Sequence, residues 1–153
     1  MYIFDTNSLI KIFGIPKKVF PSMWEQFDAL VKEGSILSVR EVSKEIAEGD
    51  GLLTDWAKVH KRVFQEPTAE EALFLQEIFK VKHFQQALEQ KKRLRGGAFA
   101  DPFVIAKAKI LNATVVTEEK FKPTAAKVPN ICKHFKVDCA NLEEFMEKEG
   151  WKF

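Results

Sequence analysis

Short apolar segments with the composition of buried strands alternate with amphipathic helical segments along nearly the whole chain. The first such segment, residues 2–4, is followed at once by Asp5. The clearest later one, residues 113–117, is rich in β-branched side chains. Residues 35–38 give another predicted strand, and a brief one is expected around Val137. Because strands that alternate with helices form parallel sheets with helices on both faces, the sequence predicts an α/β fold.

Helix boundaries are predicted from capping patterns and from glycine or proline breaks. A Ser, Thr or Asn followed three residues later by Glu can cap a helix start reciprocally. This pattern occurs at Ser22/Glu25, Ser38/Glu41, Thr68/Glu71 and Asn141/Glu144. The helical stretch from Thr68 to about residue 95 is longer than a typical globular helix and is expected to be two helices. Asp101 is expected to cap a helix that has Pro102 at its first position.

The composition fits one folded domain over residues 1–153. The chain is 46% hydrophobic and 12% aromatic, which is enough for a single buried core. The net charge of +2 is too balanced to indicate a polyanionic partner, so any nucleic-acid contact must come from local clusters. No apolar segment approaches the length of a membrane span and no leader pattern opens the chain, so we expect a cytoplasmic protein without a membrane partner.

Residues that often mark a zinc site or a base-stacking platform have simpler explanations in this chain. Cys132, His134 and Cys139 lack a further ligand pair for zinc, and are expected to be buried thiols and a surface histidine. Trp24 and Trp56 fall on apolar helical stripes and are expected in the core, whereas the role of Trp151 stays open.

Acidic residues lie at points that a parallel sheet brings together. Asp5 follows the first strand, Glu118 and Glu119 follow the strand at 113–117, and Asp101 opens a helix. These points lie at or beside the carboxyl edge of a parallel sheet, where ligands bind in open α/β folds. Each acid also has a simpler explanation, since the two aspartates could serve only as helix caps and the two glutamates could form a solvated turn.

A helix over about residues 39–48 contributes a further acid. Glu41 and Glu45 lie four residues apart on one helix face. Glu41 is expected to reach back to the helix start as part of a capping box, whereas Glu45 has no such task and is the better site candidate. Gathered carboxylates need a cation, and ligands that are all oxygen indicate Mg²⁺ or Mn²⁺ rather than Zn²⁺.

Four motifs together resemble those of the PIN-domain nucleases, in particular the PIN-like toxins of the VapC type. The motifs are Asp5-Thr6-Asn7, Val42-x-x-Glu45-Ile46, Ala100-Asp101-Pro102-x-x-Ile105-Ala106 and Val115-Val116-Thr117-Glu118-Glu119. The resemblance implies a three-layer α/β/α sandwich with a central, mainly parallel five-strand sheet. It also implies an acidic Mg²⁺ or Mn²⁺ site, cleavage of single-stranded RNA, and a cognate antitoxin protein as partner. Since PIN-like toxins are often dimers, a homodimer is a further expectation.

Carried over by position, the resemblance makes Asp5, Glu45 and Asp101 catalytic metal ligands. The family has Thr-x-Asp at the fourth position, where this chain has Glu119, which is one methylene longer. Glu119 is therefore the expected fourth ligand, and Glu118 is its immediate competitor. The residues expected to orient the acids or a water are Thr6, Asn7, Thr117 and Glu118.

A basic run lies shortly before Asp101. Its members are Lys91, Lys92, Arg93 and Arg95. A cationic strip beside a metal site suits the phosphate backbone of RNA. A solvated helix end, favoured by the helix dipole, is an equally good explanation.

Three hypotheses follow from these patterns. The first is a metal-dependent endoribonuclease, the toxin of a toxin–antitoxin pair, in which water attacks a phosphodiester in line. The second is a non-catalytic PIN-like module that binds RNA or protein, and acids at all four positions argue against it. The third is an aspartate-dependent phosphotransferase, which ranks last because such enzymes have Asp-x-Asp where this chain has Asn7.

Overall fold

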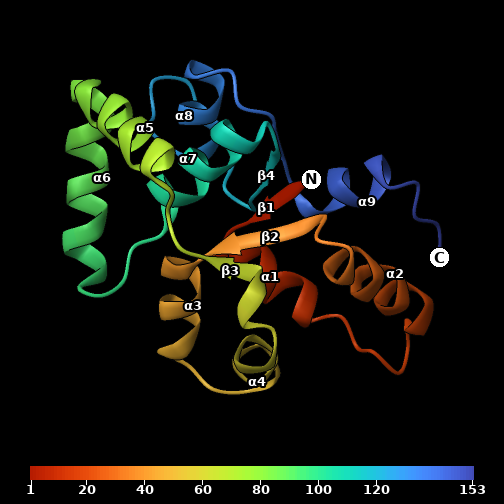
Figure 1. The fold of residues 1–153 in the computed structure, drawn as a ribbon. Coiled ribbons are helices and arrows are strands. Elements are labelled where there is room, and N and C mark those ends of the chain that lie inside the picture. The colour runs from red at the N-terminus through yellow and green to blue at the C-terminus, as the bar shows by residue number, and fades with distance from the viewer.

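The computed structural model describes residues 1–153 as a three-layer α/β/α fold (Figure 1). Five strands form one central sheet in the order β3-β2-β1-β4-β5, and every neighbouring pair is parallel. The strands are β1 (Tyr2–Phe4), β2 (Ile36–Val39), β3 (Phe64–Gln65), β4 (Thr114–Val116) and β5 (Cys139–Ala140). The predicted α/β fold with a five-strand parallel sheet is therefore confirmed.

Nine α-helices and one short 3₁₀ helix, Lys61–Val63, connect and cover the strands. The α-helices are α1 (Thr6–Phe13), α2 (Pro21–Lys32), α3 (Arg40–Ala47), α4 (Leu52–Val59), α5 (Ala69–Lys80), α6 (Lys82–Arg95), α7 (Asp101–Leu111), α8 (Val128–His134) and α9 (Leu142–Lys148). None of them is long and apolar enough to cross a membrane.

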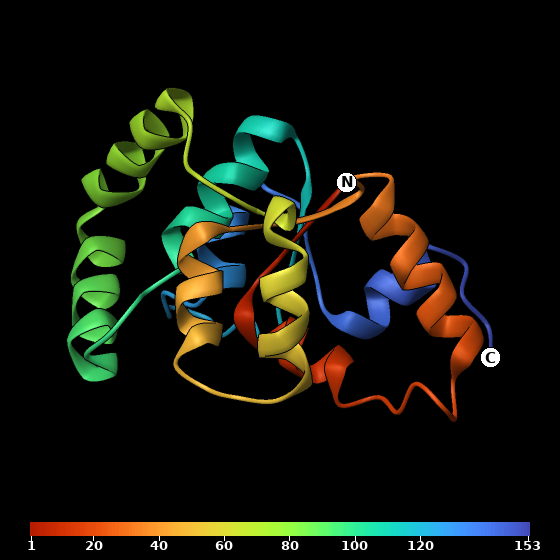
Figure 2. The ribbon, with the colours of Figure 1, turned by 60° about the horizontal axis from the view of Figure 1, so that its bottom comes forward.

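The helices form two layers around the sheet. Helix α7 packs across β1, β2 and β4, α5 packs on α7, and α6 is the outermost element on that side (Figure 1). Helices α2 and α9 pack on β2 and β5 on the other side of the sheet (Figure 1). Figure 2 brings forward α3 and α4, which pack against each other, and shows α5 and α6 as an outer layer.

The strand order defines where a ligand site can form. The chain builds the sheet outward from β1 through β2 to β3, and then returns to the other side of β1 for β4 and β5. The order therefore reverses between β1 and β4, where Phe4 pairs with Val116. Ligands of open parallel sheets bind at the carboxyl ends of the strands beside such a reversal. The residues that follow these two strands are Asp5 and Thr117.

The core contains the central strand and two of the three tryptophans. Trp24 and Trp56 are buried in an aromatic cluster around Phe27, which confirms their predicted place in the core. Trp151 is half-buried, and its ring packs edge to face on Phe145 with 5.2 Å between ring centroids. None of the three therefore stands out from the surface as a free stacking platform.

The helix boundaries confirm some of the predicted caps and correct others. Reciprocal capping boxes form at Thr68/Glu71 and Asn141/Glu144. The predicted division of the 68–95 stretch is also confirmed, because α5 ends and α6 begins around Val81. The predicted box at Ser22 is wrong: α2 begins at Pro21, and its N-cap Phe20 makes no side-chain hydrogen bond. Proline at the first position already has the helical φ, so this start does not need a side-chain cap.

The capping box predicted at Ser38 and Glu41 is also wrong, because Ser38 makes a tertiary contact instead. Ser38 is fully buried in β2, and its hydroxyl donates to the carbonyl oxygen of Phe4 at 2.6 Å. Val39 is instead the N-cap of α3, without a side-chain hydrogen bond. The Ser38 hydroxyl therefore bonds to the neighbouring strand β1, and it is not available to cap α3 as the local sequence pattern predicts.

Candidate functional site

Asp5 lies at the end of β1 and begins α1. Its Oδ1 accepts the Ser8 N–H at 2.8 Å, so its predicted role as a helix cap is confirmed. The Ser8 hydroxyl also donates to the carbonyl oxygen of Val116 at 2.9 Å, which ties the start of α1 to the end of β4. Burial, together with the charge of Asp101, raises the pKa of Asp5 to about 6, although hydrogen bonds from Thr117 and Ser8 oppose the increase. Asp5 is thus a buried carboxylate with a second one nearby.

Asp101 and Glu45 are joined through the start of α7. Asp101 is the first residue of α7 and not its N-cap, which is Ala100. The Ala100 N–H donates to Oε2 of Glu45 at 3.0 Å, and Oε1 of Glu45 accepts the hydroxyl of Thr6. Since Glu45 supplies this acceptor from α3, the carboxylate of Asp101 is left for other contacts. Burial raises the pKa of both acids, and the charge of Asp101 adds to the increase at Glu45.

Glu41 is buried but makes neither the cap predicted for it nor a contact with the other acids. Its Oε1 accepts from the guanidinium of Arg40 at 2.9 Å, while its Oε2 is buried without a hydrogen-bond partner. Of the two acids on α3, only Glu45 therefore contacts the elements that carry Asp5 and Asp101.

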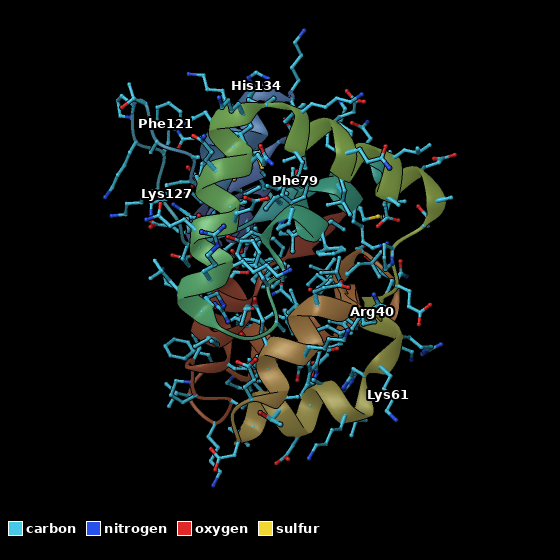
Figure 3. All side chains as sticks on the ribbon, turned by 90° about the vertical axis from the view of Figure 1, so that its left-hand side faces the viewer. Arg40, Lys61, Phe79, Phe121, Lys127 and His134 are labelled. Carbon is cyan, nitrogen blue, oxygen red and sulfur yellow. The ribbon has the colours of Figure 1, made fainter.

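Glu119 faces the acid cluster, and both of its carboxylate oxygens accept hydrogen bonds. Its Oε1 accepts from the ammonium of Lys91, and its Oε2 accepts the Val128 N–H at 2.8 Å. The Glu119 N–H donates to the Thr117 hydroxyl at 3.2 Å, which fixes the turn after β4. Burial alone would raise the pKa of Glu119, but these hydrogen bonds and the charges of Lys91 and Lys127 lower it (Lys127 is labelled in Figure 3).

Glu118, the sequence competitor of Glu119, turns away from the cluster. Its Oε2 accepts from the ammonium of Lys11 at 2.7 Å, and its Oε1 accepts the Leu142 N–H at 2.8 Å. Glu118 therefore links α1 to the start of α9. Asn7, which was expected to orient the acids, is exposed, and its side chain makes no hydrogen bond.

The basic run divides between the acid cluster and solvent. The ammonium of Lys91 lies 2.5 Å from Oδ2 of Asp101 and also donates to Glu119. Burial opposes its charge, but the two carboxylates outweigh burial and raise the pKa of Lys91. One helical turn later, the guanidinium of Arg95 lies 3.5 Å from Oε2 of Glu45. The other members of the run, Lys92 and Arg93, are exposed on α6, the helix that faces the viewer in Figure 3.

The end of α6 is held close to α3. Gly96 ends the helix in the left-handed conformation, with φ of 67°. The Ala98 N–H then donates to Oε1 of Glu48 at 3.3 Å. A Cβ atom at Gly97 would lie only 2.5 Å from the same oxygen, so the exposed side chain of Glu48 would have to move to admit a larger residue. The path from α6 to α7 is thus fixed beside the acids that Lys91 and Arg95 contact.

The donor chemistry of the cluster suits a hard divalent cation, although four acids do not surround one point. Asp5, Glu45 and Asp101 offer only oxygen ligands, and burial raises the pKa of each. No three Asp, Glu, His or Cys side chains converge closely enough to hold a metal ion. The cation among the carboxylates is Lys91. Asp101 keeps Oδ1 without a protein donor, and with Asp5 it is the best-placed ligand for an ion.

The two cysteines and His134 were expected to be buried thiols and a surface histidine, and the structure confirms this for Cys132 and His134. Cys132 is a buried free thiol, Cys139 is partly exposed and His134 is exposed.

A hollow of about 360 Å³ lies beside the acids on the β4–β5 side of the site. Its lining includes Thr117, Glu119, Lys120, Phe121, Pro129 and Asn141. Glu119 lines this hollow, whereas Asp5, Glu45 and Asp101 do not.

Two functional features of the cluster are missing from the sequence-based prediction. Ser8, which holds Asp5 and the end of β4, could have been identified as a small polar residue directly before an apolar helical stripe. The contact of Lys91 with Asp101 and Glu119 left no local signal, because it depends on the path of α6 across the fold.

A search of curated proteins finds none that matches the chain. A family model matches residues 2–153, which is nearly the whole chain. The chain therefore belongs to the family DUF4411, described as a domain of unknown function.

Proposed function

We propose that the chain is a metal-dependent endoribonuclease that cleaves single-stranded RNA and serves as the toxin of a toxin–antitoxin pair. The observation that supports this most is that the carboxylates of Asp5 and Glu45 both lie near that of Asp101, beside the reversal point of a parallel sheet. The resemblance of the same motifs to PIN-domain nucleases supports the reaction class. A buried group of carboxylates is costly for a folded protein, so it calls for a functional reason.

In this proposal, Asp5 and Asp101 hold Mg²⁺ or Mn²⁺. When bound, the ion would supply positive charge that lowers the pKa of a water and stabilises negative charge on a phosphodiester oxygen. Glu45 keeps the start of α7, and with it Asp101, in place through the Ala100 N–H. The hydroxyls of Thr6 and Thr117 orient Glu45 and Asp5 from behind.

The RNA backbone would contact the exposed part of the basic run. Lys92 and Arg93 are free on the outside of α6, and Lys120 lines the hollow beside Glu119. Cations spaced along a groove that leads to a metal site suit the phosphates of a single strand. For an antitoxin or a second copy of the chain, α4 offers Leu52 and Val59, which are seven residues apart and both exposed.

A second candidate function is supported by Lys91. Its ammonium already lies among the acids, so the cluster has a cation of its own. A non-catalytic module that binds RNA or protein would need no metal ion in addition to this ammonium.

The two candidates differ in their response to metal. We would incubate the purified chain with labelled single-stranded RNA and Mn²⁺ or Mg²⁺, beside an EDTA control and a double-stranded RNA. Cleavage of the single strand that EDTA abolishes is the expected result. The same ions are expected to raise the melting temperature, because they bind only the folded site. RNA binding without cleavage, and without a shift in melting temperature, would favour the non-catalytic module.

A further inference from the structure

Both carboxylate oxygens of Glu119 already accept hydrogen bonds. Lys91 donates to its Oε1, and the Val128 N–H donates to its Oε2 at 2.8 Å. The side chain is only 16% exposed, so neither hydrogen bond is easily replaced by water. The glutamate side chain at position 119 thus accepts hydrogen bonds from the Lys91 ammonium and from the Val128 backbone amide at the same time.

Lys91 stands where a second cation would neutralise the cluster. Its ammonium bridges Asp101 and Glu119, which come from the start of α7 and from the turn after β4. Divalent ions in two-metal sites bridge carboxylates in the same manner. An ammonium and a divalent ion cannot share this position, since both need the same oxygens and repel each other.

The position of Lys91 is built into the fold. Arg95, one turn further along α6, lies 3.5 Å from Oε2 of Glu45. After the helix, the Ala98 N–H donates to Oε1 of Glu48 at 3.3 Å, which ties the connection to the end of α3. Two cations on one face of α6 therefore contact the acids, and the connection to α7 holds that face in place.

We infer that Lys91 is a positioning residue that takes the place of a second divalent ion. The site then binds a single ion through Asp5 and Asp101, and Glu119 holds Lys91 and does not coordinate metal. This inference rests on the proposed metal-dependent function and specifies how many ions and which acids that function uses.

Mn²⁺ titration of the full chain tests the inference without measuring cleavage. Free Mn²⁺ is followed by electron paramagnetic resonance at neutral pH, and bound ions per chain are counted for the wild type and three variants. Lys91→Met removes the ammonium and keeps the length of the side chain. Lys91→Met/Glu119→Gln removes both charges of the pair. Lys92→Met is the matched control, because it removes an exposed charge from the adjacent position.

We expect about one Mn²⁺ per chain for the wild type and for Lys92→Met, and about two for Lys91→Met, in which Asp101 and Glu119 are free to bind an ion. The double variant should return to about one. Circular dichroism reports whether each variant is folded. If Lys91→Met does not fold, the double variant, in which both charges of the pair are removed, still tests the inference. If the double variant bound no Mn²⁺ while the wild type bound one ion, Glu119 would be a ligand of that ion, and the inference would be overturned.

Two other results overturn it in distinguishable ways. Two ions on the wild type, or one ion on folded Lys91→Met, would reject the role of Lys91 and leave a metal-dependent nuclease standing. No bound ion on any of the four proteins would reject the inference and the proposed metal dependence together.

Discussion

The backbone N–H of Ala100 donates a hydrogen bond of 3.0 Å to Oε2 of Glu45. Through this contact, an acid on α3 holds the residue that precedes Asp101 at the start of α7. The same carboxylate accepts the hydroxyl of Thr6 at the start of α1. Glu45 therefore links the three helices that carry the proposed catalytic acids, whereas Glu41, one turn earlier, contacts only Arg40.

This difference predicts opposite effects for two matched substitutions on α3. Glu45→Gln keeps the size of the side chain but removes its charge and weakens its contacts with Thr6 and Ala100. RNA cleavage should fall by about 10- to 100-fold, as is typical when a group that orients metal ligands is changed. Glu41→Gln should leave cleavage within about twofold and change the free energy of unfolding by about 1 kcal/mol at most, because its ion pair with Arg40 is partly exposed. Equal losses, or a greater loss for Glu41→Gln, would contradict the assignment.

Asp5→Asn should stabilise the folded protein in a pH-dependent manner. Burial raises the pKa of Asp5 from 3.8 to about 6, so the folded state holds this proton more tightly than the unfolded state. Stability therefore falls as the pH rises between these values, and stays lower above them. Asparagine does not ionise and remains a good N-cap, so the variant should gain up to about 3 kcal/mol at pH 8 and almost nothing at pH 4. Urea denaturation at both pH values measures the difference, and a loss of stability at pH 8 would refute the prediction.

A buried ion pair away from the site should be essential for stability. Lys107 on α7 is 2% exposed, and its ammonium lies 3.1 Å from Oε1 of Glu71 on α5. Lys107→Met would leave Glu71 charged and unpaired in the core, which should cost about 3–5 kcal/mol in urea denaturation. Lys109→Met, on the exposed side of the same helix, should cost less than about 1 kcal/mol. Similar costs for the two variants would show that the buried pair contributes little.

The sequence indicated the sheet and the position of the acids because both depend on local patterns. Three apolar residues before Asp5, and β-branched residues before Thr117, are enough to predict strands that end in polar side chains. A parallel sheet then brings such strand ends to one edge without further information. The meeting of Asp5 with Asp101 could be anticipated from these rules together with the resemblance to PIN-domain nucleases.

Features that depend on tertiary contacts could not be predicted in this way. The pattern at Ser38 and Glu41 matches a capping box, but the neighbouring strand takes the hydroxyl of Ser38. Lys91 belongs to a basic run that resembles a solvated helix end, and only the path of α6 brings it to Asp101. The same holds for Lys107, because its partner Glu71 lies 36 residues away in the sequence.

Cleavage of labelled single-stranded RNA by Asp101→Asn tests the central claim most directly. Glu143→Gln is the matched control, since Glu143 is an exposed acid in the first turn of α9 and makes no hydrogen bond. With Mn²⁺ present, the wild type and Glu143→Gln should cleave at equal rates, and Asp101→Asn should cleave at least about 100-fold more slowly while its melting temperature is maintained. Cleavage by folded Asp101→Asn at the rate of the wild type would contradict a nuclease site built from these carboxylates.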